Sequence, residues 1–313
     1  YLAGKRRRGE RKGGGRYDLA ILVDPKEAEP PSDEGALKRF TKAAEATGFN
    51  VETITRDDFA RLPAFDALFI RETTSVNHHT YRFARRAVAE GLVAIDDPES
   101  ILKCTNKVFL AELMERHKVP VPRTLIVHRD NRDRIVPELG LPVILKQPDS
   151  SFSQGVTKVE DEAALPGAVS ALLEKSDLII AQEYLPTDYD WRVGVFDHQP
   201  IFACRYFMAK GHWQILKRDG EGVKQAEGGV ETLPVEHAPA AVVRTALKAA
   251  NLIGDGLYGV DLKQVGQKVY VIEVNDNPNI DAGFEDKILK DELYERFMRV
   301  MMRRVERRKE GNS

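Results

Sequence analysis

Short apolar runs alternate with helix-like runs over the first hundred residues of the chain. Strands are expected at residues 17–24, 51–54, 66–71 and 92–96. Residues 32–47 and 81–90 have helical patterns, and Ser32 or Asp33 can cap the start of the first helix while Gly48 ends it. Strands that alternate with helices indicate a parallel sheet with covered faces. We therefore expect a first α/β unit over residues 17–102.

Two further units are expected after the first. Residues 103–185 begin with a helix at 105–118 and a Pro-bounded stretch at 119–127, and continue with strands at 142–147, 155–159 and 178–185 around a helix at 162–174. Residues 186–313 contain strands at 190–196, 200–209, 212–217, 257–265 and 268–275, and a helix at 240–251. A charged helix is expected from about residue 285, with Leu289, Leu293, Phe297 and Val300 at helical spacing.

Composition adds limits to this picture. The chain has 313 residues, 42% of them hydrophobic, and no run of the ~18–20 apolar residues that a membrane helix needs. Its two cysteines, Cys104 and Cys204, lie far apart and do not have the spacing of metal ligands, so a reducing cytoplasm is the expected location. No membrane partner is expected.

The first sixteen residues form a basic arm with seven Lys or Arg and one Glu. The formal net charge is −2, so the arm's +6 leaves −8 on the remaining chain. A basic segment can bind nucleic acid, but this one has no aromatic residues interleaved with its charges, and three consecutive glycines follow them. We therefore expect residues 1–16 to be a flexible, solvated arm, and a nucleic-acid partner is not favoured.

One apparent phosphate motif is excluded by its context. Residues 254–259 (GDGLYG) match the written pattern of a dinucleotide-binding loop. That loop works only where a strand leads into the helix whose N-terminus faces the phosphates, whereas here a helix enters and a strand leaves. The glycines are therefore expected to end a helix and turn the chain.

Oxygen ligands converge on two strands near the end of the chain. Side chains alternate along a strand, so Glu273 and Asn275 point the same way. An antiparallel neighbour at 257–265 would add Asp261 to the same face. Such hard oxygen donors suit Mg²⁺ or Mn²⁺, two of which a bridging glutamate can hold for phosphoryl transfer. The alternative is that Glu273 and Asn275 lie on a solvated strand edge.

Lysines and hydroxyl groups suitable for phosphate occur earlier in the chain. Lys107 begins a helix, and Lys146 ends an apolar strand where an unpaired ammonium is costly unless an anion meets it. A hydroxyl-rich loop follows, with Ser151, Ser153 and Gly155 able to close over phosphates. A strand then enters a Pro-containing connector at residues 182–186, where backbone groups can bind an adenine edge.

The order of these motifs resembles the ATP-grasp superfamily and, within it, the RimK-like carboxylate-amine (glutamate) ligases. The resemblance covers residues 17–283. The motifs that carry it are NK at 106–107, ILKQ at 144–147, QEYL at 182–185, DWR at 190–192, Arg205, GVD at 259–261 and EVNDNP at 273–278. It implies an α/β (α+β) ATP-grasp fold with a Rossmann-like parallel-sheet domain at 17–102, a small lid subdomain at 103–185 and a C-terminal antiparallel-sheet subdomain at 186–313.

The resemblance also implies a role for each matching residue. ATP phosphates would contact Lys107, Lys146 and the loop with Ser151, Ser153 and Gly155, and adenine would lie on Gln182, Glu183, Tyr184 and Leu185. Asp190 would hold the ribose. Two Mg²⁺ or Mn²⁺ ions would bind Asp261, Glu273 and Asn275, and Arg205, helped by Arg192, would neutralise the acyl phosphate, with Lys146 also acting in the reaction.

Substrate contacts are less well specified by the sequence. Arg71, Thr73 and Thr74 follow a parallel strand, where open sheets bind ligands, and are expected either to grip a substrate carboxylate or to serve structure. Lys210 and Lys224, with His212 and glycines 228–229, are further candidates, although this segment and the lid loop, with its single glycine, depart from the family pattern. His78 and His79 are expected to be surface or capping residues, because no third metal ligand has suitable spacing.

We therefore expect an ATP- and Mg²⁺-dependent ligase that forms an amide or peptide bond through an acyl phosphate. Its partners would be a carboxylate and an amine on a small molecule, peptide or protein, with glutamate a candidate amino acid. Related ligases form dimers or tetramers, so the resemblance implies a homo-oligomer. The alternatives are a nucleotide sensor or scaffold without turnover and a kinase that phosphorylates a hydroxyl group.

Overall fold

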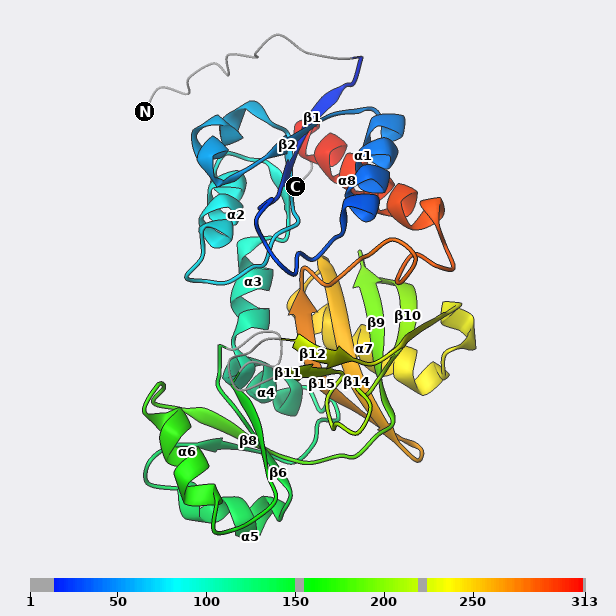
Figure 1. Ribbon diagram of the computed structural model, residues 1–313. Coiled ribbons are helices and arrows are strands. Elements are labelled where there is room, and N and C mark those ends of the chain that lie inside the picture. The colour runs from blue at the N-terminus through cyan, green and yellow to red at the C-terminus, as the bar shows by residue number, and fades with distance from the viewer. Residues whose placement is uncertain (1–13, 150–154, 219–223, 312–313) are drawn as a thin grey trace.

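The computed structural model describes residues 14–149, 155–218 and 224–311, and arranges them in three layered units along one axis (Figure 1). The expected fold class is confirmed: the described residues form a four-stranded parallel sheet, antiparallel sheets of four and five strands, and a two-stranded ribbon. No helix in these ranges combines the length and apolar character that crossing a bilayer requires.

The first unit is a parallel sheet with strand order β2-β1-β3-β4. Its strands are β1 (Tyr17–Leu22), β2 (Phe49–Ile54), β3 (Ala67–Ile70) and β4 (Val93–Ile95), with α1 (Glu34–Thr47), the 3₁₀ helix η1 (Arg56–Ala64) and α2 (His79–Ala89) between them. The Asp33 carboxylate caps α1 by accepting from the Ala36 amide, and Gly48 ends it at φ 103°, a left-handed value that glycine adopts without strain. The caps that the sequence predicts therefore set the length of α1.

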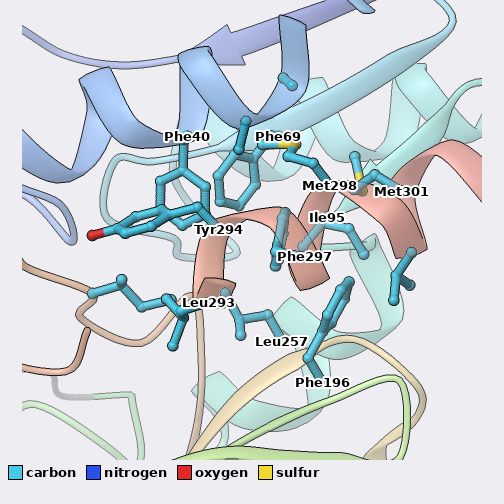
Figure 2. Packing of buried hydrophobic residues seen from close by; sticks show 14 of the residues in the cluster. Phe40, Phe69, Ile95, Phe196, Leu257, Leu293, Tyr294, Phe297, Met298 and Met301 are labelled. Atoms are coloured by element: carbon cyan, nitrogen blue, oxygen red, sulfur yellow. The ribbon is translucent and has the colours of Figure 1, made fainter. Parts of the chain in front are cut away.

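The last helix, α8 (Asp291–Lys309), packs in a core that the first and third units share, although its place in the sequence suggested the third unit alone. Phe40 of α1 lies edge-on to Tyr294 and to Phe69, with ring centroids 4.6 and 4.9 Å apart (Figure 2). Phe297 contacts Phe69 at 4.6 Å and stacks on Phe196 of the third unit at 4.4 Å. This aromatic cluster joins the first and last parts of the chain in one core.

The helix expected at 105–118 is α4 (Lys107–Arg116), and a separate helix that was not expected, α3 (Pro98–Thr105), precedes it. Asn106 between them is extended at φ −97° and ψ 102°. Its side-chain oxygen accepts from the Phe109 amide and so caps α4. Asn favours such caps over helix interiors because its side chain competes for backbone hydrogen bonds. The cap places Lys107 in the first turn of α4.

The second unit is an antiparallel sheet with strand order β5-β8-β6-β7. Its strands are β5 (Thr124–Val127), β6 (Val143–Lys146), β7 (Val156–Val159) and β8 (Ile179–Glu183). The 3₁₀ helix η2 (Arg132–Arg134) and α5 (Ile135–Leu139) connect β5 to β6, and α6 (Leu165–Leu173) connects β7 to β8. Helices α5 and α6 pack on one face of the sheet. Leu145 and Ala181 face the helices in a small core. By strand alternation, Lys146 and Gln182 face the opposite side.

The third unit is an antiparallel sheet with strand order β13-β10-β9-β14-β15. Its strands are β9 (Tyr189–Phe196), β10 (Gln199–Phe207), β13 (Val230–Leu233), β14 (Leu257–Val265) and β15 (Lys268–Asp276). A two-stranded ribbon of β11 (Leu216–Arg218) and β12 (Lys224–Glu227) precedes β13, and η3 (Val235–His237) leads into α7 (Ala240–Ile253). One face, with Trp191 and Val260, packs on α7, which leaves Arg192 and Asp261 on the other.

Candidate active site

A cleft lies between the uncovered face of the second sheet and the edge strand β15 of the third. Its empty space, with the open mouth included, is about 480 Å³. Most of its lining is apolar, including Leu110, Met114 and Val271. The lining also includes Lys107, Thr124, Lys146, Gln182 and Glu273. The cleft therefore combines an apolar wall with a few charged and polar groups.

The three oxygen ligands expected on neighbouring strands lie together. Asp261 of β14 is directly opposite Glu273 of β15, and Gly259 is opposite Asn275. The Asn275 amide donates to Asp261 Oδ2 over 3.0 Å. A Cβ on Gly259 would lie 2.7 Å from Pro278 Cβ, so only glycine there lets the loop after β15 close over the sheet.

Cationic side chains hold both carboxylates of this group. Arg192 of β9 donates from Nε and Nη2 to the two oxygens of Asp261, over 2.7 and 2.9 Å. The Lys107 ammonium lies 2.8 Å from Glu273 Oε1. Burial favours the neutral acid, but the nearby Lys107, Lys146 and Arg192 charges outweigh it and lower the pKa of Glu273. Two carboxylates and an amide oxygen form a donor set of the kind that Mg²⁺ prefers.

Lys146 and Gln182 connect the second sheet to the cleft. The Lys146 ammonium donates to Gln182 Oε1 over 2.8 Å, and Gln182 Nε2 donates to Thr124 Oγ1 over 3.0 Å. Burial lowers the pKa of Lys146 to about 8, and the Lys107 charge adds to the effect. Two ammonium groups thus face one end of the cleft, where an anion would relieve their repulsion.

Asp190 lies two residues before Arg192 on β9, and therefore on the same face of the third sheet as Arg192 and Asp261. Its Oδ1 accepts from Lys263 over 2.5 Å and from Thr187 over 3.0 Å. Burial nonetheless raises its pKa. Lys263 is a site residue that was not among those expected from the sequence. Alternation along β14 could have indicated it, because Lys263 follows Asp261 by two residues and so lies on the same face.

The segment expected to receive adenine divides between two environments. Gln182 lines the cleft. The Glu183 carboxylate instead accepts from the Arg123 backbone amide over 2.8 Å and from its guanidinium over 2.7 Å. Tyr184 lies edge-on to Trp213, with centroids 6.2 Å apart, and Leu185 is half-buried. Glu183 is therefore held by Arg123, the residue just before β5, rather than presented to the cleft.

Arg205, expected at the reaction centre, lies apart from the Asp261 group. Arg205 of β10 is opposite Trp191, whose face of the sheet packs on α7, whereas Arg192 is opposite Asp261. The Arg205 guanidinium lies 4.8 Å from the Trp191 ring centroid and 3.3 Å from the Glu231 carboxylate. Strand register therefore separates the two arginines, and only Arg192 joins the carboxylate group.

Arg71 is also not placed to grip a substrate. Its side chain is 1% exposed and donates to Ser32 Oγ, Asn277 Oδ1 and the carbonyls of Pro31 and Pro278. Burial lowers its pKa to about 10. The structural alternative for Arg71 therefore holds, because the guanidinium joins the loop before α1 to the loop after β15.

The two threonines after Arg71 bond to carboxylates. The Thr73 hydroxyl and amide donate to Glu27, and the Thr74 hydroxyl donates to Asp276 Oδ2 over 2.6 Å. The bond from Thr74 connects the first unit to the end of β15. Neither hydroxyl caps α2, whose N-cap residue is His78.

The remaining predicted residues lie in loops and in the β11–β12 ribbon. Ser151 and Ser153 fall outside the described residues. Gly155 has φ 67°, and its carbonyl accepts from the Gln147 amide over 3.2 Å. Lys210 is exposed and Lys224 begins β12, while His212 Nε2 lies 3.3 Å from Gln214 Oε1. No described contact joins Lys210 or His212 to the Asp261 group.

A family model of the RimK-like ATP-grasp domain matches residues 104–291, which is more than half of the chain. A relative named probable alpha-L-glutamate ligase, from Marinomonas sp. (strain MWYL1), is 25% identical over 276 residues, covering 82% of this chain and 88% of its own.

Two solved structures share the fold. The D-cycloserine synthetase DcsG is 18% identical with a TM-score of 0.71, over 92% of this chain and 99% of its own. The D-alanine–D-alanine ligase from Bacillus anthracis complexed with ATP is 15% identical with a TM-score of 0.67, over 93% and 98% of the two chains.

Proposed function

Since the chain belongs to the RimK-like ATP-grasp family of ligases, we propose that it joins a carboxylate to an amine at the expense of ATP, through an acyl phosphate. The observation that supports this most directly is the convergence of Lys107, Lys146 and Glu273 at one end of an apolar cleft, beside Asp261 and Asn275. Cationic and anionic groups therefore meet at the junction of two sheets. The phosphates of a nucleoside triphosphate require the cationic groups, and its metal ion requires the anionic groups.

The cleft suits a nucleotide in one orientation. Its apolar wall, with Leu110, Met114 and Val271, matches the flat face of a purine. The ammonium groups of Lys107 and Lys146 at the other end match the phosphates. Gln182 lines the same cleft, where its amide accepts from Lys146 and donates to Thr124. Adenine therefore lies between the sheets, with the phosphates directed toward Glu273.

Asp261, Glu273 and Asn275 would hold Mg²⁺. A bound Mg²⁺ would neutralise charge on the phosphate oxygens that bridge to it. In this structure Arg192 is hydrogen-bonded to Asp261 and Lys107 is paired with Glu273, so these cations orient the two carboxylates. Lys107 is then released from Glu273 toward a phosphate when the nucleotide enters.

The chemistry requires activation of the carboxylate, because oxide is a poor leaving group. A donor carboxylate oxygen attacks the terminal phosphorus of ATP, the bond to the bridging oxygen breaks, and ADP leaves. The amine nitrogen then attacks the acyl carbon, phosphate departs with the C–O bonding pair, and the nitrogen loses a proton. Lys146 and Arg192 are the side chains that offset charge on the transferred phosphoryl group.

Glutamate is the amino acid that we propose as a substrate, on an acceptor that is a small molecule, a peptide or a protein. The support is the name of the relative from Marinomonas, which aligns over most of both chains.

The test is a screen of amino acids and acceptors with ATP and Mg²⁺, read by phosphate release and by mass spectrometry of the product. We expect amide product and phosphate in equal amounts. A phosphorylated hydroxyl product would indicate a kinase instead, and tight ATP binding with no product across the screen would indicate a sensor.

The matched variants are Glu273→Gln and Glu231→Gln. Glu273→Gln should abolish turnover because it removes a ligand charge, with unfolding temperature as the check on folding. Glu231 pairs with Arg205 on the other face, so Glu231→Gln should retain activity. Equal loss in both variants would contradict the assignment.

A further inference from the structure

Glu72, His78 and His79 meet at the end of β3 and the start of α2, outside the cleft. One ligand atom from each lies within 4.8 Å of the other two, and His79 Nε2 is 2.8 Å from Glu72 Oε2. The two imidazole rings lie side by side, with centroids 3.9 Å apart. The expectation that the histidines have no third ligand is therefore wrong, since Glu72, six residues before His78 in the same segment, supplies it.

The carboxylate of Glu72 is buried, and one of its oxygens has no hydrogen-bond partner in the described part of the chain. The residue is 1% exposed, and its Oε1 has no hydrogen-bond partner among the described residues. A buried polar atom without a partner destabilises the folded state, and more so when it is charged. The other oxygen, Oε2, contacts His79 within the group of three ligands. A bound cation would supply the missing partner.

The surrounding charges favour a cation at this position. Burial, with the carboxylates of Glu27 and Asp24 nearby, raises the pKa of Glu72 to about 7. Burial lowers the pKa of His79 to about 4, with help from His78, so its imidazole is neutral at neutral pH and has a lone pair to donate. The positive charge of Arg56 opposes a bound cation, and it also lowers the pKa of both Glu72 and His79.

We propose that Glu72, His78 and His79 form a binding site for a divalent transition metal of the Zn²⁺ class. Two imidazole nitrogens and one carboxylate are a ligand set that Zn²⁺ takes at about 2.0–2.2 Å, with a fourth position left for water or substrate. His78 is exposed, which gives the ion an entry path. Nitrogen ligands distinguish this site from the oxygen-only group at Asp261, so the two sites select different metals.

This site does not depend on the proposed ligase activity, and its test does not use turnover. Metal-free, untagged full-length protein is titrated with Zn²⁺ by calorimetry in excess Mg²⁺, which fills the oxygen-only group. We expect one equivalent of Zn²⁺ to bind. Co²⁺ added in place of Zn²⁺ should give visible absorption bands typical of nitrogen ligation.

Variants assign the ligands. Glu72→Gln, His78→Ala and His79→Ala should each weaken Zn²⁺ binding by on the order of a hundredfold or more, since even outer-shell substitutions cost about 10–100-fold. His237→Ala removes an exposed histidine elsewhere, and Glu273→Gln alters the oxygen-only group, so both should bind as the parent does.

Folding of each variant is checked by its thermal transition. His78→Ala keeps the test decisive if Glu72→Gln unfolds, because His78 is exposed. The proposal is overturned if the parent binds no Zn²⁺ at micromolar concentration, or if His78→Ala and His79→Ala bind it unchanged.

Discussion

Arg192 and Arg205 point to opposite faces of the third sheet and therefore meet different groups, Asp261 for Arg192 and Glu231 for Arg205. The sequence places both near the motif that resembles an ATP-grasp strand, and either could neutralise an acyl phosphate. Their faces depend on how β9 and β10 pair, and a shift of one residue would exchange them. That register is a tertiary property, set by packing of Trp191 against α7 and not visible in either strand alone.

We predict that conservative substitution separates the two arginines. Arg192→Lys should lower turnover by about a hundredfold to a thousandfold, because a point charge cannot replace the paired donors to Asp261. Arg205→Lys retains a cation beside Trp191 and should stay near the parent rate. Steady-state kinetics at saturating ATP measure both, and a larger loss in Arg205→Lys would reverse our assignment.

Lys146 should give the reaction a pH limit on the alkaline side. Its ammonium has a pKa of about 8 because the side chain is buried, so it is charged below that pH and neutral above it. We expect kcat/KM for ATP to fall as pH rises through about 8, since this parameter reports ionisation of the free enzyme.

Two comparisons check the source of this limit. The turnover number at saturating ATP should fall less, because bound phosphate raises the pKa of Lys146. In Lys146→Arg the alkaline fall should move to higher pH, since a guanidinium stays charged. A kcat/KM profile that is flat to pH 9.5 would remove Lys146 from phosphate binding.

At the scale of elements, the sequence predicts the hairpin of β14 and β15 well. Its alternation fixes which side chains share a face, so Asp261, Glu273 and Asn275 are correctly expected together. The helix start at Lys107 is also expected, whereas the separate helix α3 just before it is not, and the Asn106 cap divides the two helices. Local pattern therefore predicts these elements better than it predicts their junctions.

The helix α8 should stabilise the first unit more than its position at the end of the chain suggests. Phe297 is 2% exposed and contacts rings from β3 and β9. We predict that Phe297→Ala lowers the free energy of unfolding by about 3–5 kcal/mol, typical of a buried ring replaced by a methyl group.

Phe284 provides the control for this prediction. Its ring is 52% exposed, so Phe284→Ala should change the free energy of unfolding by about 0.5 kcal/mol or less. Chemical denaturation followed by tryptophan fluorescence measures both variants. Similar values for Phe284 and Phe297 would mean that α8 is not part of the cooperative core.

At the scale of the whole molecule, the cleft exists only because two sheets and α4 meet. Lys146 comes from the second sheet, Lys107 from α4 and Glu273 from the third sheet. Sequence motifs identify all three. The sequence alone leaves the role of Arg71 open between substrate binding and structure, since the loops that Arg71 joins are about 250 residues apart and no local pattern relates them.

ATP with Mg²⁺ should therefore stabilise the whole chain by bridging its parts. At a concentration of 100 times its dissociation constant, a ligand that binds only the folded state adds about 2.7 kcal/mol. We predict a higher unfolding temperature with ATP and Mg²⁺, and little change in Lys146→Met, which loses the ammonium in the cleft. An equal rise in the variant would place the nucleotide elsewhere.

The position of α8 in the first core has a consequence for synthesis. About 200 residues separate Ile95, at the end of the parallel sheet, from Phe297, which covers it. At about 5–20 residues per second, the ribosome needs roughly 10–40 s to make that length. During this interval the nascent parallel sheet has emerged without its final layer, so its exposed aromatic face is a natural target for chaperones.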